Sequence, residues 1–171
     1  MDHRDSNWQA CYAQLAPKLV LFARQWVYGM ADAEDVVQNA FVKFWRHQPD
    51  AKPEHYPLLY ATVRTCALDF IRGHDRRVRR ENDERAPVIR GDAPFFDRVV
   101  EQHETTGTLE AALQRLPEQQ REVLVLRIWG ELTFADIATA LGESINTIAS
   151  RYRYALEALR RIVKPSQYER V

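Results

Sequence analysis

The sequence is poor in glycine and cysteine. Its 171 residues contain six glycines and two cysteines. None of the glycines lies in a G-x-G-x-x-G or G-K-[ST] setting, which argues against a nucleotide-binding loop. Cys11 and Cys66 lie far apart and lack the spacing of metal ligands. We therefore expect two buried thiols in a reducing compartment rather than a disulfide.

Long apolar runs are also missing. No stretch approaches the roughly 18–20 apolar residues that are needed to span a bilayer, and residues 1–5 lack the apolar core of a signal peptide. The five histidines are scattered and form no pair with metal-ligand spacing. We expect a cytoplasmic protein without membrane insertion, without catalytic residues and without a metal or other cofactor.

The formal net charge is zero, but the charges are segregated along the chain. Five arginines, here called the arginine cluster, fall within nine residues beside the single acid Asp75: Arg72, Arg76, Arg77, Arg79 and Arg80. In residues 81–107 acids outnumber bases, and Pro87, Gly91 and Pro94 interrupt any period. This pattern predicts an acidic linker after a basic helix end.

Apolar residues recur at three- and four-residue steps, which is typical of amphipathic helices. We expect a first helix across residues 8–27, kinked or restarted at Pro17, and a second helix with Asp32 as its N-cap that ends before Pro49. A third helix should begin near Pro57, and after the linker further helices should cover residues 109–116 and 117–129, with Gly130 placed to end the latter. With no β alternation, the fold class is all-α: a helical domain at 5–80, the acidic linker at 81–107, and a second domain at 108–165.

The second domain carries the most specific local pattern. Thr133 and Asp136 have the spacing of a capping box, Gly142 should end that helix, and Ser144 can cap the next one. The next helix has an apolar face that is expected to include Ile145, Ile148, Tyr152, Ala155, Leu156, Leu159 and Val163. Two short helices joined by a tight turn indicate a helix-turn-helix.

In a helix-turn-helix the second helix enters the DNA major groove. Residues outside its apolar face are candidates for contacts with bases or phosphates: Asn146, Thr147, Ser150, Arg151, Arg153 and Tyr154. The alternative is a solvated helix face on an ordinary bundle, but the agreement of caps, breaker and apolar stripes favours groove binding.

The arginine cluster also has two interpretations. Cations are favoured at a helix C-terminus, but five arginines exceed what this effect requires and favour a phosphate-contacting surface. Tyr56 and Tyr60 either stack on unpaired bases or pack in the core.

Four segments, in this order and spacing, resemble bacterial sigma factors of the extracytoplasmic-function group, which contain only the second and fourth sigma domains. The first two are residues 33–45 (AEDVVQNAFVKFW) and 59–72 (LYATVRTCALDFIR). The last two are residues 116–127 (LPEQQREVLVLR) and 146–155 (NTIASRYRYA).

The resemblance implies three sets of contacts. Core RNA polymerase would be bound by the D-x-x-Q helix through Asp35, Gln38, Asn39 and Lys43. The minus-10 promoter element would be captured and opened by Tyr56, Arg64, Thr65, Asp69 and the arginine cluster. The helix-turn-helix residues given above would read the minus-35 element, so the expected partners are core RNA polymerase, promoter DNA and an anti-sigma factor.

Four positions depart from the family pattern: Thr65 replaces a usual Asn, a Trp is usual near Leu58, Ala149 replaces a usual basic residue, and Tyr154 a usual Arg. Two alternative functions stay open, and the departures at Thr65, Ala149 and Tyr154 support only the second. The chain could be a stand-alone helix-turn-helix regulator of duplex DNA, or a sigma-like protein that sequesters its partners.

Overall fold

The computed structural model describes residues 3–81 and 112–163, and these ranges contain helices but no strand. The predicted all-α fold is confirmed. The chain divides into two compact units, Met1–Asp92 and Ala93–Val171, called unit 1 and unit 2 below. The predicted domain bounds stay predictions, because all of the linker except Glu81 lies outside the described residues.

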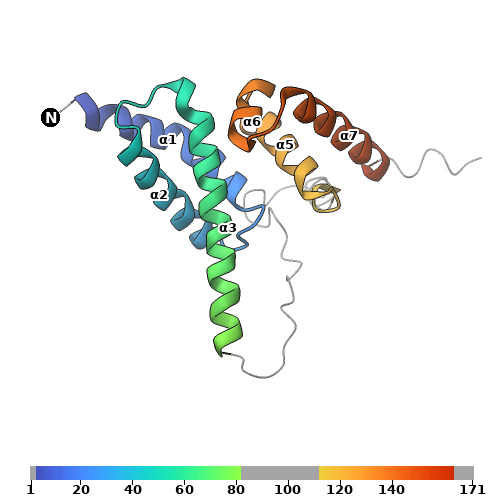
Figure 1. Cartoon of the computed structure of the whole chain (residues 1–171), viewed down its shortest axis with the longest axis horizontal. Helices are drawn as coiled ribbons and strands as arrows, with labels where there is room; N and C mark the ends of the chain where they lie inside the picture. The colour runs from blue at the N-terminus through green and yellow to red at the C-terminus, as the bar shows by residue number, and fades with distance from the viewer. Residues whose placement is uncertain (1–2, 82–111, 164–171) are drawn as a thin grey trace, which may run out of the picture. The chain divides into compact units, whose positions relative to one another are not determined.

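Unit 1 is a bundle of three helices, α1 (His3–Ala23), α2 (Met30–His47) and α3 (Tyr56–Glu81) (Figure 1). A short 3-10 turn, η1 (Pro53–His55), leads into α3. Each helix turns one apolar stripe inward, as its 3.6-residue period requires. The shared core includes the fully buried side chains of Leu19, Phe22, Val37, Phe41, Leu59, Tyr60 and Val63.

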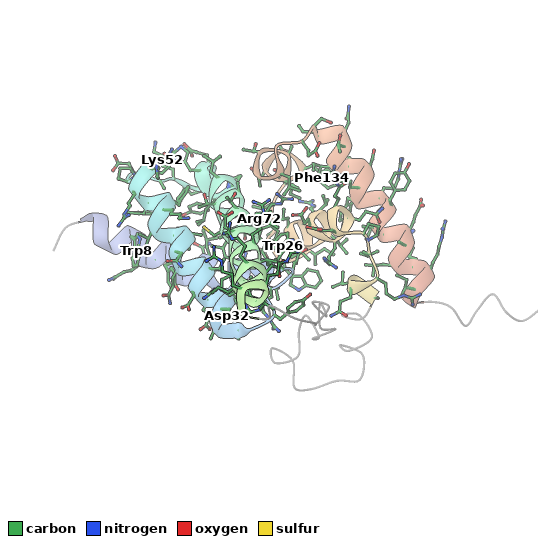
Figure 2. All side chains as sticks on the ribbon, turned by 60° about the horizontal axis from the view of Figure 1, so that its bottom comes forward. Trp8, Trp26, Asp32, Lys52, Arg72 and Phe134 are labelled. Carbon is green, nitrogen blue, oxygen red and sulfur yellow. The ribbon has the colours of Figure 1, made fainter. Side chains whose placement is uncertain are left out.

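Aromatic rings join the first two helices. Trp8 stacks on Tyr12 with ring centroids 5.8 Å apart, and Tyr12 meets Phe41 edge-on at 4.8 Å. Trp8, labelled in Figure 2, also lies edge-on to Phe41, with ring centroids 6.5 Å apart. Aromatic pairs with these offsets add packing energy beyond the area that they bury, so this end of α1 is held against α2.

The start of α2 differs from the prediction. The helix begins at Met30 with Gly29 as its N-cap, and the N–H of Ala33 donates to the Gly29 carbonyl at 3.0 Å. Asp32 is therefore not the cap but an acid of the first turn, where the helix dipole still favours it. The predicted end before Pro49 is confirmed.

Pro17 lies inside the continuous helix α1 and does not end it. Its side chain is exposed, whereas the neighbouring Leu15 and Leu19 are buried. Because tertiary packing stabilises the helix on both sides of the proline, the one missing backbone hydrogen bond is tolerated.

The C-terminal part of α3 projects beyond the ends of α1 and α2 (Figure 1). No residue from 72 to 80 is buried, and all five members of the arginine cluster are exposed. The cluster therefore lies on a single helical arm that is surrounded by solvent within unit 1.

Unit 2 consists, in its described part, of α5 (Glu118–Ile128), α6 (Phe134–Leu141) and α7 (Ile145–Val163), with α5 packed on both other helices. The helix expected around residues 117–129 is thus present, capped by Pro117 and Trp129. Core side chains come from all three helices and from the segment before α5: Leu113, Leu124, Leu126, Ile137, Ile148 and Ala155.

The described residues contain neither a membrane-spanning helix nor a group of metal-ligating side chains. None of their helices combines the length and the apolar character that a membrane span requires. Among residues 3–81 and 112–163, no three His, Cys, Asp or Glu side chains are grouped so that they could hold a metal ion.

Candidate polymerase and nucleic-acid interfaces

The helix-turn-helix of unit 2 is fixed by three local devices that the sequence predicts. The N–H of Thr133 donates to Asp136 Oδ2 at 3.0 Å, and the N–H of Asp136 donates back to Thr133 Oγ1 at 3.1 Å, a reciprocal capping box. Gly142 ends α6 with φ +67°. Ser144 Oγ then accepts the N–H of Thr147 at 3.1 Å and caps α7. All three devices are confirmed.

Cation–π and aromatic contacts hold α6 between its two neighbours. The guanidinium of Arg127 lies 5.3 Å from the ring centroid of Phe134, and its Nη1 donates to the Leu132 carbonyl at 2.8 Å. The other contact of Phe134, labelled in Figure 2, is with Tyr152 of α7, edge-on at 5.4 Å. These contacts hold α6 against α5 on one side and against α7 on the other.

The candidate DNA-binding face lies on α7, opposite the buried Ile148 and Ala155. Asn146, Arg153 and Tyr154 are exposed, whereas Thr147, Ser150 and Arg151 are half-buried. At 100° per residue, Asn146, Ser150 and Arg153 share one side of the helix. The guanidinium of Arg153 lies 5.3 Å from the Tyr154 ring centroid.

Ile145 is not part of the apolar core of unit 2, contrary to the prediction. Its residue surface is 52% exposed, in the first turn of α7 directly after the Ser144 cap. The sequence pattern places Ile145 in phase with Ile148, but a period alone does not show where the covering helix ends.

The polymerase-binding candidates of α2 share one solvent-facing side. Asp35, Gln38, Asn39 and Lys43 are all exposed, and the opposite side of the helix is buried through Val36, Val37, Ala40, Phe41 and Phe44. Val42, which was not among the predicted contacts, is 46% exposed between Asn39 and Lys43. Its position outside the apolar stripe of α2 could have indicated an exposed apolar residue from the sequence.

The minus-10 candidates follow α3, and the structure brings only some of them together. Asp69 Oδ1 lies 3.5 Å from Arg72 Nη1 on the exposed surface, and Thr65 Oγ1 is exposed and donates to the Ala61 carbonyl at 3.0 Å. Arg64 is half-buried, 6.0 Å from the ring centroid of Trp26. Leu58, near which the family usually has a Trp, is 40% exposed near the start of the same helix.

The two tyrosines at the start of α3 have different environments. Tyr60 is a core residue, 1% exposed and edge-on to Phe22 at 5.6 Å, so stacking on a base is ruled out for its buried ring. Tyr56 is half-buried and hydrogen-bonded to the Cys11 thiol of α1. Burial, followed by this hydrogen bond, raises the pKa of Tyr56 to about 12.

Comparison with known families assigns both units. Residues 11–77 match Sigma-70 region 2, and residues 106–159 match Sigma-70 region 4. The RNA polymerase sigma factor SigV of Bacillus subtilis is 30% identical over 144 residues, which are 81% of this chain and 80% of SigV. The ECF RNA polymerase sigma factor RpoE of Cereibacter sphaeroides is 29% identical over 166 residues, covering 93% and 88% of the two chains.

Solved structures show the same fold. The sigma factor RpoE in complex with the anti-sigma factor NepR from Bartonella quintana has a TM-score of 0.69 at 22% identity, over 92% of this chain and 97% of that chain. CnrH in complex with the cytosolic domain of CnrY has a TM-score of 0.61 at 20% identity, over 95% and 90%. With both sigma regions matched in order, the chain belongs to the extracytoplasmic-function (ECF) group of the sigma-70 family of RNA polymerase sigma factors.

Proposed function

We propose that this sigma factor directs core RNA polymerase to promoters by reading the minus-35 element with unit 2 and by opening the minus-10 element with unit 1. The observation that carries the proposal is the capped helix-turn-helix of region 4, present in one chain with the exposed α2 face of region 2. A sigma factor is not an enzyme, since nucleotide addition belongs to the polymerase.

The minus-35 element is read as duplex by the N-terminal turns of α7. Asn146 and Arg153 supply exposed amide and guanidinium donors on the side that Ser150 shares, and such groups pair with base edges in the major groove. Tyr154, 51% exposed, adds an aromatic surface next to them. Thr147 and Arg151 lie at the flank of this side.

The minus-10 element is bound along α3. The arginine cluster on the projecting arm supplies five exposed cations for phosphates, and Thr65, Asp69 and the half-buried Arg64 and Tyr56 lie nearer the start of the helix, where the opened strand is held. Extruding a base costs a few kcal/mol, which phosphate contacts along the arm offset.

Core RNA polymerase is bound by the exposed side of α2. Asp35, Gln38, Asn39 and Lys43 provide polar contacts, and Val42 provides an apolar centre among them. A small apolar centre with a polar rim is the usual anatomy of a protein–protein interface.

Two further assignments follow from the same function. A sigma factor works where the polymerase and the promoter are, so the protein acts in the cytoplasm. An anti-sigma factor is proposed as a further partner, because the similar sigma factor RpoE of Bartonella quintana was solved in complex with the anti-sigma factor NepR.

Run-off transcription tests the proposal. Purified bacterial core polymerase is incubated with pooled genomic fragments, with and without the protein, and the transcript ends are mapped. New discrete start sites with two shared upstream elements are the expected result.

Two other outcomes would each support a different function. Capture of core polymerase without new transcripts would indicate a sequestering protein. Binding of duplex DNA by a chain that does not capture core polymerase would indicate a stand-alone regulator.

A further inference from the structure

Within residues 3–81 and 112–163, Arg151 is the one cation of the candidate minus-35 face for which an ion pair is seen. Its Nη2 donates to Glu143 Oε1 at 2.9 Å. Glu143 belongs to the turn between α6 and α7, eight residues before Arg151. Side chains on a helix lean toward its N-terminus, so the Arg151 side chain runs back along α7 to reach the turn.

The pair is shielded from solvent more than an ordinary surface pair. The Arg151 side chain is only 19% exposed and that of Glu143 is 39% exposed. Partial burial lowers the effective dielectric constant, which strengthens the attraction relative to fully exposed ions. Arg153, by contrast, is exposed and lies on the same side of α7 as Asn146.

The position of Arg151 agrees with a supporting role. It lies three residues after the fully buried Ile148 and four before the fully buried Ala155, so it borders the core side of α7 rather than the side of Asn146, Ser150 and Arg153. Moving its guanidinium to a DNA phosphate would leave the Glu143 carboxylate without its partner and close to the anionic backbone.

We propose that Glu143 is a positioning residue that holds Arg151 away from the phosphates, so that α7 reads the minus-35 duplex through Asn146, Ser150 and Arg153. This inference rests on the proposed function. The neutral Glu143–Arg151 pair releases no counterion when DNA binds. The pair also prevents Arg151 from contacting a phosphate, a contact that would not depend on the DNA sequence. Glu143 thereby favours discrimination between promoters over general affinity for DNA.

The test measures binding of the holoenzyme to two short duplexes by fluorescence anisotropy. One duplex carries a minus-35 element defined by run-off mapping, and the other has a random sequence of equal length. Affinity is measured between about 50 and 200 mM salt, since each phosphate contact changes the slope of log K against log salt by about 0.9. The proteins are wild type, Glu143→Gln, Arg151→Met and the double variant.

We expect Glu143→Gln to gain affinity for DNA only when Arg151 is present. Arg151→Met alone leaves the salt slope unchanged, whereas Glu143→Gln steepens it by about 0.9, tightens binding to the random duplex and lowers the ratio of promoter to random affinity. Adding Arg151→Met to Glu143→Gln restores the wild-type slope. Glu157→Gln, which removes an exposed acid of α7 outside the pair, serves as the control for loss of one negative charge.

Two results would overturn the inference. A slope reduced by about 0.9 in Arg151→Met would show that Arg151 contacts a phosphate in the wild-type complex. If the double variant binds the random duplex as tightly as Glu143→Gln does, the gain in affinity would come from removing the repulsion between Glu143 and the phosphates and not from Arg151. Arg151→Met keeps most of the side-chain volume, and thermal unfolding of each variant confirms that unit 2 is intact. Wild-type holoenzyme that fails to distinguish the two duplexes would instead contradict the proposed function.

Discussion

Gly73 lies inside a helix, whereas Gly142 has a left-handed backbone conformation. Substitution by alanine should therefore change stability in opposite directions at the two positions. Gly142 caps α6 with φ +67°, so Gly142→Ala should lower the free energy of unfolding of unit 2 by about 1 kcal/mol. Gly73 lies inside α3, where an added Cβ meets nothing within 4 Å, so Gly73→Ala should raise that of unit 1 by about 0.5–1 kcal/mol. Urea denaturation of both variants measures the difference, and two shifts of the same sign would contradict it.

At the same scale, the residues predicted correctly from the sequence are those whose structure depends on near neighbours. The capping box of Thr133 and Asp136 joins atoms three residues apart, and Gly142 needs only its own backbone angle. The exposure of Ile145 and the burial of Tyr60 could not be predicted in this way, because they depend on helices that are distant in the sequence. The pairing of Glu143 with Arg151 spans eight residues across a turn, so it also required the structure.

Among the elements, α1 and α3 are joined by a hydrogen bond between two ionisable groups, in which the Tyr56 hydroxyl of α3 donates to the Cys11 sulfur of α1. Burial raises the pKa of the Cys11 thiol above its ordinary value of 9.0, and the pKa of Tyr56 rises from 10.0 to about 12. Both groups bind their protons more tightly in the folded chain, so their contribution to stability is complete below pH 9 and is lost as pH rises through the raised values.

Unit 1 should therefore lose stability between about pH 9 and 12, and Tyr56→Phe should reduce that loss. The measurement is urea denaturation of wild type and variant at a series of alkaline pH values. Absorbance titration of tyrosine gives an independent readout, since the raised pKa of Tyr56 should place one ionisation step near pH 12, and this step should disappear in Tyr56→Phe. The same alkaline loss of stability in both proteins would contradict the assignment to Tyr56.

The exposed side of α2 gives a second prediction at the scale of elements. Val42→Glu places a charge in the middle of the proposed polymerase contact, and it should weaken capture of core polymerase by at least tenfold, about 1.4 kcal/mol. Since Val42 is 46% exposed, the fold should be kept. Gln14→Glu, which adds the same charge at an exposed position of α1, is the matched control, and equal losses in both variants would exclude a specific α2 contact.

The existence and order of the helices could be predicted from apolar periodicity, whereas their ends could not always be. The sequence offers Asp32 as the better capping side chain, yet the N-cap of α2 is Gly29, three residues earlier. Pro17 predicts a kink or a new first turn, yet no new helix begins there and α1 continues through it. In both cases packing of the buried stripe outweighs a local preference of about 1–3 kcal/mol.

At the scale of the whole molecule, the two proposed binding tasks lie on different units of the chain. Polymerase capture is proposed for α2 and duplex reading for α7, so each task can be removed without the other. Val42→Glu should lose capture of core polymerase but keep binding to the minus-35 duplex. Arg153→Ala, which removes an exposed guanidinium of α7, should show the opposite pattern and lower duplex affinity by about 1–3 kcal/mol.

A mixture of the two variants tests whether both tasks must reside in one chain. One sigma factor must bind the polymerase and the promoter together, so equal amounts of Val42→Glu and Arg153→Ala should not restore run-off transcription, although each missing task is present in the mixture. Because a tethered second contact acts at a high effective concentration that separate chains lack, the yield should stay at the level of the better single variant. Restored transcription would show that the two units can act from different chains, and polymerase recruitment and promoter reading would then have to be assigned to a sigma dimer.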